Sequence, residues 1–153
     1  MFESVHAVDR GGIRGLWQRL RPGAFALGLS KLLESLRFAD GQGQLWPLRV
    51  LTPDEKLSKP LKSAGCAVVV EAVPTSQGAD ALCLWLHDEH TISGLEAQLA
   101  CVRSGGLVIL CSRPGQLPRH RLTAAFLHAG LSEVVQLDAG RYLLTAGQVQ
   151  PRY

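Results

Sequence analysis

The densest cluster of side chains that could do chemistry is the run His87-Asp88-Glu89-His90. Imidazoles and carboxylates gathered in one turn could act as general acids and bases. His87 and His90 could also reach one metal ion from a helical turn, but a metal centre needs further ligands, and none stands out. In a third reading the run is a polar loop, and Asp88 or Thr91 caps the helix that follows. The sequence predicts no metal centre and assigns no catalytic residue.

A second candidate is Glu71, an acidic residue within the apolar run Cys66–Val73. A carboxylate at the end of a strand can hold the ribose hydroxyl groups of a nucleotide-like ligand. It can equally be a carboxylate that only water solvates. If the chain binds a cofactor, the residues expected to contact it are Glu71, His87 and Asp88.

The elements that would position these side chains alternate between strands and helices after residue 45. Residues 47–52 form a probable strand, and continuous apolar runs, typical of strands buried on both faces, cover residues 66–73, 79–87 and 107–112. Helical periodicity and capping residues predict helices at 53–65, 91–105 and 117–130. The last two strands, 132–138 and 141–147, flank a tight turn with Gly140 at its positive-φ position.

This alternation predicts an α/β fold: a doubly wound, mostly parallel sheet with a C-terminal antiparallel hairpin strand, preceded by N-terminal helices. Residues 46–153 would form this Rossmann-like domain. Residues 1–45 would form a helical extension that packs on the domain or extends from it. Its second helix, Phe25–Phe38, is expected to cover an edge of the sheet.

The first helix of the extension carries a candidate partner-binding surface. Ile13, Leu16, Trp17 and Leu20 recur at the spacing of one helical face. Arg14, Trp17 and Arg21 are the residues that we expect to meet a partner. The helix is short for an independent membrane anchor, so contact with a membrane surface is not expected.

Composition sets broad bounds on function. The chain has 153 residues, of which 46% are hydrophobic and 19% charged, and its net charge is +3. Nucleic-acid binding is not expected, because it calls for a larger and clustered basic excess. The four cysteines form no C-x-x-C pair, which favours buried thiols in a reducing compartment. The N-terminus has no signal-peptide pattern and no apolar run is long enough to span a membrane, so a cytoplasmic protein is predicted.

Residues 78–148 resemble the C-terminal half of a class I S-adenosylmethionine-dependent methyltransferase. The stretch "GADALCLWLHDEH" is similar to the fourth strand of that family, and "LEAQLACVRSGGLVILCSR" to its helix, glycine pair and fifth strand. The stretch "LTAAFLHAGLSEVVQLDAGRYLLTAG" is similar to the helix and the two strands that close the sheet. The resemblance implies a seven-stranded sheet whose last strand is antiparallel.

The N-terminal half departs from that family's cofactor-binding pattern. The family places a glycine-rich turn after its first strand, but here the turn is "TPDEKL", and Gly41 and Gly43 follow a predicted helix instead. Two strands, not three, precede the stretch at Gly78. These departures predict a pseudo-methyltransferase without a cofactor, a scaffold subunit that binds another protein subunit or a second copy of itself. The alternatives are an active S-adenosylmethionine-dependent methyltransferase with an unorthodox cofactor loop, and a subunit that completes a partner's active site.

Overall fold

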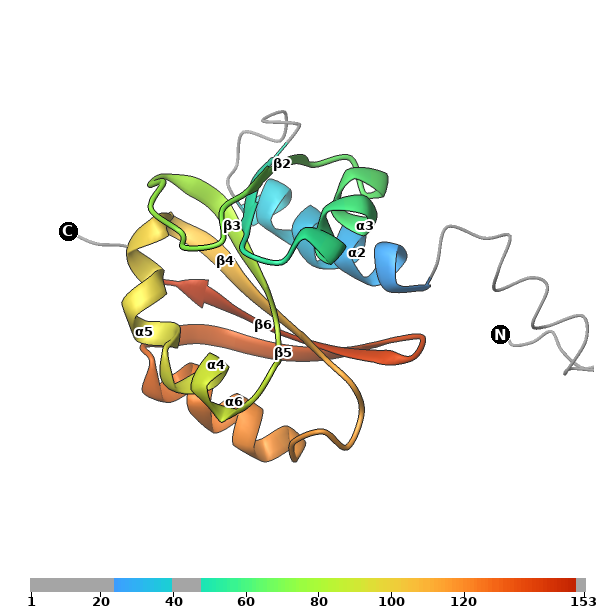
Figure 1. The fold of residues 1–153 in the computed structure, drawn as a ribbon, viewed down its shortest axis with the longest axis vertical. Coiled ribbons are helices and arrows are strands. Elements are labelled where there is room, and N and C mark those ends of the chain that lie inside the picture. The colour runs from blue at the N-terminus through green and yellow to red at the C-terminus, as the bar shows by residue number, and fades with distance from the viewer. Residues whose placement is uncertain (1–23, 40–47, 151–153) are drawn as a thin grey trace, which may run out of the picture.

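A computed structural model of the chain describes residues 24–39 and 48–150, drawn in colour in Figure 1. The predicted first helix and the candidate partner-binding residues Arg14, Trp17 and Arg21 lie outside the described residues.

Within the described residues the core is one six-stranded sheet in the order β2-β1-β3-β4-β6-β5. Its strands are β1 (Arg49–Thr52), β2 (Ala67–Val70), β3 (Ala79–Trp85), β4 (Val102–Ser112), β5 (Leu131–Ala139) and β6 (Tyr142–Val149). Strands β2, β1, β3 and β4 are parallel, and β6 is antiparallel to both of its neighbours. Gly140 has a φ of 69° in the β5–β6 turn, as predicted. The predicted fold class is therefore confirmed.

Helices cover both faces of the sheet (Figure 1). One layer holds α2 (Ala24–Ala39) and α3 (Ser58–Ser63), and α3 follows a 3₁₀ turn, η3 (Glu55–Leu57). The other layer holds α4 (Glu89–Ser93), α5 (Leu95–Gln98), the 3₁₀ turn η4 (Leu99–Cys101) and α6 (Arg119–His128). Each layer closes its own apolar cluster, which is why β3 and β4 are apolar on both faces.

Helix α2 lies on a face of the sheet and not along its edge. It contacts α3, β5, β6 and β4. It approaches the hairpin so closely that a Cβ on Gly28 would lie 2.8 Å from the Cβ of Ala139. The expectation that this helix covers an open edge was therefore wrong, because its apolar face packs against the hairpin strands β5 and β6.

Strand β2 is an edge strand, with β1 as its one neighbour in the sheet. The sequence predicts a strand buried on both faces here, but Val69 is 37% exposed and Val70 is 42% exposed. That prediction was wrong. A β-branched apolar run cannot by itself tell a central strand from an edge strand, because that depends on the order of the strands.

The glycine pair of "VRSGGLVIL" lies inside a strand. The predicted helix over 91–105 ends early, since β4 begins at Val102. The Asp80 carboxylate holds this region by accepting hydrogen bonds from Arg103 Nε and Arg49 N, both at 2.7 Å. Gly105 has a φ of 82°, a conformation that L side chains rarely adopt. These residues join the amino ends of β1, β3 and β4, at the opposite end of the sheet from the candidate site.

All four cysteines are free and buried, as predicted. The Sγ atoms of Cys83 and Cys111 lie 3.8 Å apart on adjacent strands. Burial raises the pKa of the Cys66 thiol to about 11, so this thiol is protonated and unreactive at neutral pH. Among the described helices, none combines the length and the apolar character that a membrane crossing requires.

Candidate functional site

The candidate site lies at the carboxyl end of the parallel strands, where β1 and β3 are neighbours. From β1 the chain continues to β2 on one side, and β3 pairs with β1 on the other side. The order in which strands are added to the sheet thus reverses between β1 and β3, and open α/β sheets bind ligands at such a switch point. The segments that follow these two strands supply its side chains.

The turn after β1 is shaped by a buried threonine. Thr52 is fully buried, and its Oγ1 accepts a hydrogen bond from Asp54 N at 3.1 Å. The sequence predicts a helix that begins at Pro53 with Thr52 as its cap. In the structure the helical segment begins later, with the 3₁₀ turn at Glu55. The threonine bond and the proline ring together set the backbone that presents the Asp54 side chain.

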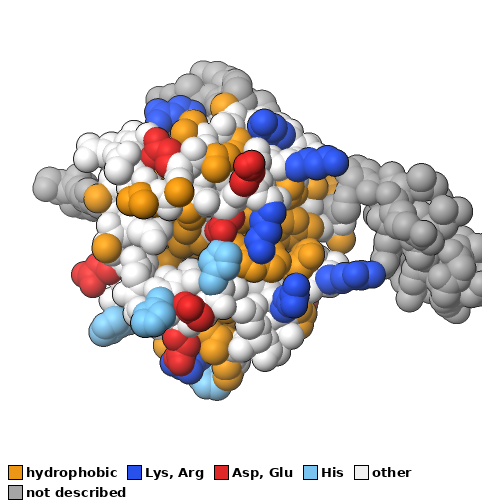
Figure 2. All heavy atoms as spheres, viewed as in Figure 1, with side chains coloured by type: hydrophobic (Ala, Val, Ile, Leu, Met, Phe, Trp, Pro, Cys, Tyr) orange, Lys and Arg blue, Asp and Glu red, His pale blue; other side chains and the backbone are white. Residues whose placement is uncertain are grey.

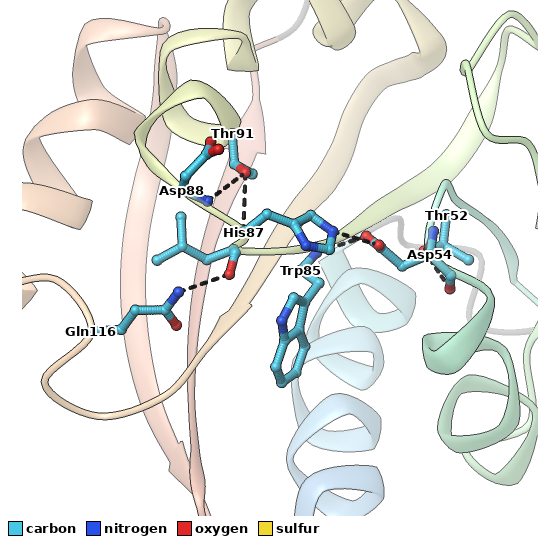
Figure 3. A network of polar contacts seen from close by, with 8 residues as sticks. Thr52, Asp54, Trp85, His87, Asp88, Thr91 and Gln116 are labelled. Atoms are coloured by element: carbon cyan, nitrogen blue, oxygen red, sulfur yellow. Dashed lines mark hydrogen bonds and ion pairs between the residues drawn. The ribbon is translucent and has the colours of Figure 1, made fainter.

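Asp54 bridges the ends of β1 and β3 (Figure 3). One carboxylate oxygen accepts a hydrogen bond from Trp85 N at 3.1 Å. The other lies 2.7 Å from His87 Nε2. The Asp54 side chain is 13% exposed and that of His87 is 57% exposed, so the pair has an inner carboxylate and an outer imidazole. Asp54 was not among the sequence candidates, although its place two residues after a strand could have indicated it.

The His87–His90 cluster separates into different roles. Asp88 is the N-cap of α4, because its side chain accepts from His90 N at 2.8 Å and Thr91 Oγ1 accepts from Asp88 N at 3.5 Å. The capping interpretation is therefore confirmed. His87 reaches toward Asp54, whereas His90 lines a separate cavity between α4 and α6. Within the described residues, no group of three or more His, Cys, Asp or Glu side chains could hold a metal ion.

A hollow of about 510 Å³ adjoins His87 between the ends of β3 and β4. Trp85 and Arg113 line it, and Gln116 fixes its loop by donating to Leu86 O at 2.9 Å and accepting from Arg113 N at 3.1 Å. Figure 2 shows this side of the molecule, where hydrophobic side chains are visible among acidic, basic and histidine side chains. The hollow is open to solvent and more polar than apolar, with Trp85 as its apolar wall.

The Trp85 ring continues the apolar wall into the protein. Lys56 Nζ lies 4.3 Å from the ring centroid, within range of a cation–π interaction. Trp85 also meets Tyr142 edge to face with 5.3 Å between centroids, and Tyr142 meets Phe25 at 5.0 Å. This chain of rings anchors the end of β3 to β6 and α2.

Glu71 directly follows β2, at the carboxyl end of that strand. Because β2 is parallel to β1 and next to it, Glu71 lies at the same end of the sheet as the Asp54–His87 pair. Its carboxylate accepts from the Ser76 hydroxyl, from Thr75 N at 2.9 Å and from Ser76 N at 3.0 Å. These hydrogen bonds, that of the Ser76 side chain first, lower the pKa of Glu71 to about 2. The group is therefore ionised at neutral pH. The Thr75 side chain also lowers this pKa through hydrogen bonding, so neighbouring groups of the same loop supply the donors around the carboxylate.

Replacing Asp54 by alanine should lower the free energy of unfolding by about 1–2 kcal/mol, because Trp85 N loses its acceptor and His87 loses its partner. Urea denaturation of the purified protein measures this loss. Asp54→Asn keeps an acceptor oxygen and should lose less. His87→Ala removes only the exposed member of the pair and should cost less than about 1 kcal/mol. A larger loss for His87→Ala than for Asp54→Ala would contradict the assignment.

Comparison with known proteins shows to which class the fold belongs. No protein-family model matches the sequence, and no curated protein matches it. Among solved structures, a ribosomal protein L11 methylase from Lactobacillus delbrueckii subsp. bulgaricus aligns with a TM-score of 0.54 at 13% identity, over 75% of this chain and 77% of the methylase. Phosphoethanolamine N-methyltransferase 2 of Haemonchus contortus aligns with a TM-score of 0.55 at 16% identity, over 84% of this chain. The chain spans 38% of that enzyme.

The described residues thus have the fold of the class I S-adenosylmethionine-dependent methyltransferases, with a six-stranded sheet. The likeness extends beyond the C-terminal half in which the sequence resemblance was found, since it includes three quarters or more of the chain in these alignments.

The prediction that the domain takes no cofactor is corrected by the same comparison. The Haemonchus enzyme was solved with S-adenosylhomocysteine in one structure and with S-adenosyl-L-methionine in another, which aligns over 86% of this chain with a TM-score of 0.54. The prediction of no cofactor rested mainly on the absence of glycine from the turn after β1. It gave too little weight to Glu71, an ionised acceptor at the carboxyl end of β2.

Proposed function

We propose that this domain binds S-adenosylmethionine, or its product S-adenosylhomocysteine, at the carboxyl ends of β1, β2 and β3. The observation that carries the proposal is the ionised Glu71 carboxylate, which directly follows β2 and is held in place by hydrogen bonds from Thr75 and Ser76. A carboxylate accepts hydrogen bonds, so it fits the hydroxyl groups of the ligand's ribose, which donate them. The fold shared with methyltransferases supports the same location.

The roles of the surrounding residues follow from their positions. Glu71 would hold the ribose, and its own bonds to Thr75 and Ser76 keep the carboxylate in place before a ligand arrives. The Asp54–His87 pair lies at the switch point and would limit how deeply a ligand enters between β1 and β3. When bound, S-adenosylmethionine supplies an electrophilic methyl group on a sulfonium centre.

Calorimetric titration of the full chain with S-adenosylhomocysteine tests the proposal. Saturable binding is expected, and Glu71→Gln should weaken it roughly 10- to 100-fold, because a hydrogen bond to a charged group is worth about 1.5–3 kcal/mol. At about a hundred times its dissociation constant, the ligand should stabilise the native protein by about 2.7 kcal/mol. A melting curve of each variant without ligand confirms that the fold is intact.

Glu96→Gln is the matched control, because Glu96 is an exposed carboxylate on α5, away from the carboxyl edge of β2. It should bind the ligand as the unaltered protein does. Absence of binding at millimolar ligand would overturn the proposal. Equal affinity of Glu71→Gln and the unaltered protein would overturn the role given to Glu71.

A second candidate function is that of a protein-interaction or scaffold subunit, and the exposed apolar edge of β2 favours it. The two functions are compatible, because a bound cofactor can stabilise a subunit whether or not its methyl group is transferred. The non-catalytic character of the domain, the completion of a partner's active site and the cytoplasmic location stay predictions.

A further inference from the structure

The two edges of the sheet differ in how they are protected against pairing with another strand. At the β5 edge, Glu133 has a φ of 54° and the register with β6 shifts between Ser132 and Val135. Charged Glu133 and Asp138 lie in this strand, and Arg119 pairs with Asp138 at 2.7 Å. Bulges and charges of this kind are the usual means by which proteins prevent edge-to-edge association.

The β2 edge carries none of these features within its four residues. Strand β2 reads Ala-Val-Val-Val, pairs with β1 in unbroken register and contains no charge. Val69 and Val70 are both exposed, and successive side chains of a strand point to opposite faces. The end of this strand is therefore open on both faces, although its composition is that of a buried strand.

The backbone of β2 shows which groups are available at the open edge. Ala67 N donates to Leu48 O at 2.8 Å, and Glu71 N donates to Thr52 O at 3.0 Å, both toward β1. Because the direction of the backbone groups alternates along a strand, those of Val68 and Val70 point away from β1. The edge thus offers two donors and two acceptors to another strand.

We propose that a second copy of this chain pairs with this edge, β2 against β2 and antiparallel about a two-fold axis. Val68 of one copy would lie opposite Val70 of the other, so that each such pair exchanges both of its hydrogen bonds. Val69 would lie on the axis, opposite itself. The same patch then serves both copies, as a two-fold interface requires, and one sheet continues through both domains.

The charges that flank β2 favour antiparallel pairing of this edge with a second copy of the chain. The strand is followed by the ionised Glu71 and is preceded by α3, where Lys59 and Lys62 are exposed. Antiparallel pairing brings the acidic end of each strand to the basic end of the other. Because a four-residue edge buries less area than a standard interface, a weak and reversible dimer is expected.

Sedimentation velocity of the full chain over a concentration series tests the dimer, without added ligand, so that its outcome is independent of cofactor binding. A reversible monomer–dimer equilibrium is expected. Val69→Lys should give a monomer throughout, because it places two like charges opposite each other on the axis. Val135→Lys, at an exposed position of the β5 edge, is the matched control and should leave the equilibrium unchanged.

A backbone variant separates pairing from side-chain effects. Val70→Pro removes an N–H that points away from β1, a position where an edge strand tolerates proline. It should abolish the dimer with the monomer still folded, as the melting curve would show. A monomer at every concentration in the unaltered protein, or a dimer that survives both Val69→Lys and Val70→Pro, would overturn the proposal.

Cross-linking tests the register directly. Residues opposite each other in a non-hydrogen-bonded antiparallel pair have Cα atoms about 4.5 Å apart, within disulfide range. Val69→Cys should therefore form a covalent dimer under oxidised glutathione, seen on a non-reducing gel. The native cysteines are all buried, and Val135→Cys is the control that should stay monomeric. Equal cross-linking at both positions would contradict the β2 interface.

Discussion

Replacing Phe126 by alanine is expected to lower the free energy of unfolding by about 3–5 kcal/mol. Phe126 is fully buried on α6 and belongs to the apolar cluster between that helix layer and the sheet. Its ring lies against Gly147 of β6, where a Cβ would come within 2.9 Å of Phe126 Cδ2. The backbones of α6 and β6 are held by their own hydrogen bonds, so a cavity left by the ring would close only in part.

Leu127→Ala is the matched control for this substitution. Leu127 is the next residue of the same helix and is 57% exposed, so its truncation should cost less than about 1 kcal/mol. Chemical denaturation of both variants gives the two free energies under the same conditions. A loss for Leu127→Ala that equals the loss for Phe126→Ala would show that α6 packs through a different face.

Gly106→Ala is expected to lower the free energy of unfolding by about 3 kcal/mol, at the upper end of overpacking effects. A Cβ at this position would lie 2.6 Å from the backbone oxygen of Asp80 in β3. The carbonyl cannot withdraw without shifting its strand, which Arg103 and Arg49 hold through the Asp80 carboxylate. The substitution should therefore weaken the junction of β3 and β4 as a whole.

Gly94→Ala separates steric conflict from a general effect of glycine replacement. Gly94 has a φ of −93°, which any residue adopts, and its nearest contact for a Cβ is His90 O at 3.3 Å. Its cost should be small, because alanine also gains helix propensity over glycine at the junction of α4 and α5. If the melting temperature falls equally for both variants, close packing at Gly106 is not the cause of its loss.

Much of the fold could be predicted from local patterns. The apolar runs at 79–87 and 107–112 indicated β3 and β4, and the turn with Gly140 indicated the closing hairpin. These features depend on residues near one another in the chain. The end of the helix before β4 was misjudged, because helical spacing continues into a segment whose Asp80 ion pair and strand partner come from distant residues.

The candidate site could be predicted in part. Glu71 lies near the end of one apolar run and His87 ends another, and the structure places both beyond the carboxyl ends of their strands. Asp54 was missed, because its bonds to Trp85 N and His87 Nε2 join segments more than thirty residues apart. Asp88 was kept as a ligand candidate, whereas its carboxylate caps α4.

The sequence by itself determined the alternation of strands and helices, the closing hairpin and the burial of the cysteines, because periodicity and turn chemistry act over a few residues. Only the tertiary structure decided that β2 lies at an open edge, that Asp54 meets His87 and that Gly106 touches β3. The physical reason is that an apolar run shows only that its residues are favoured to be buried away from water. The surface that buries such a run, and the loops that meet beside it, depend on the order and register of strands far apart in the chain.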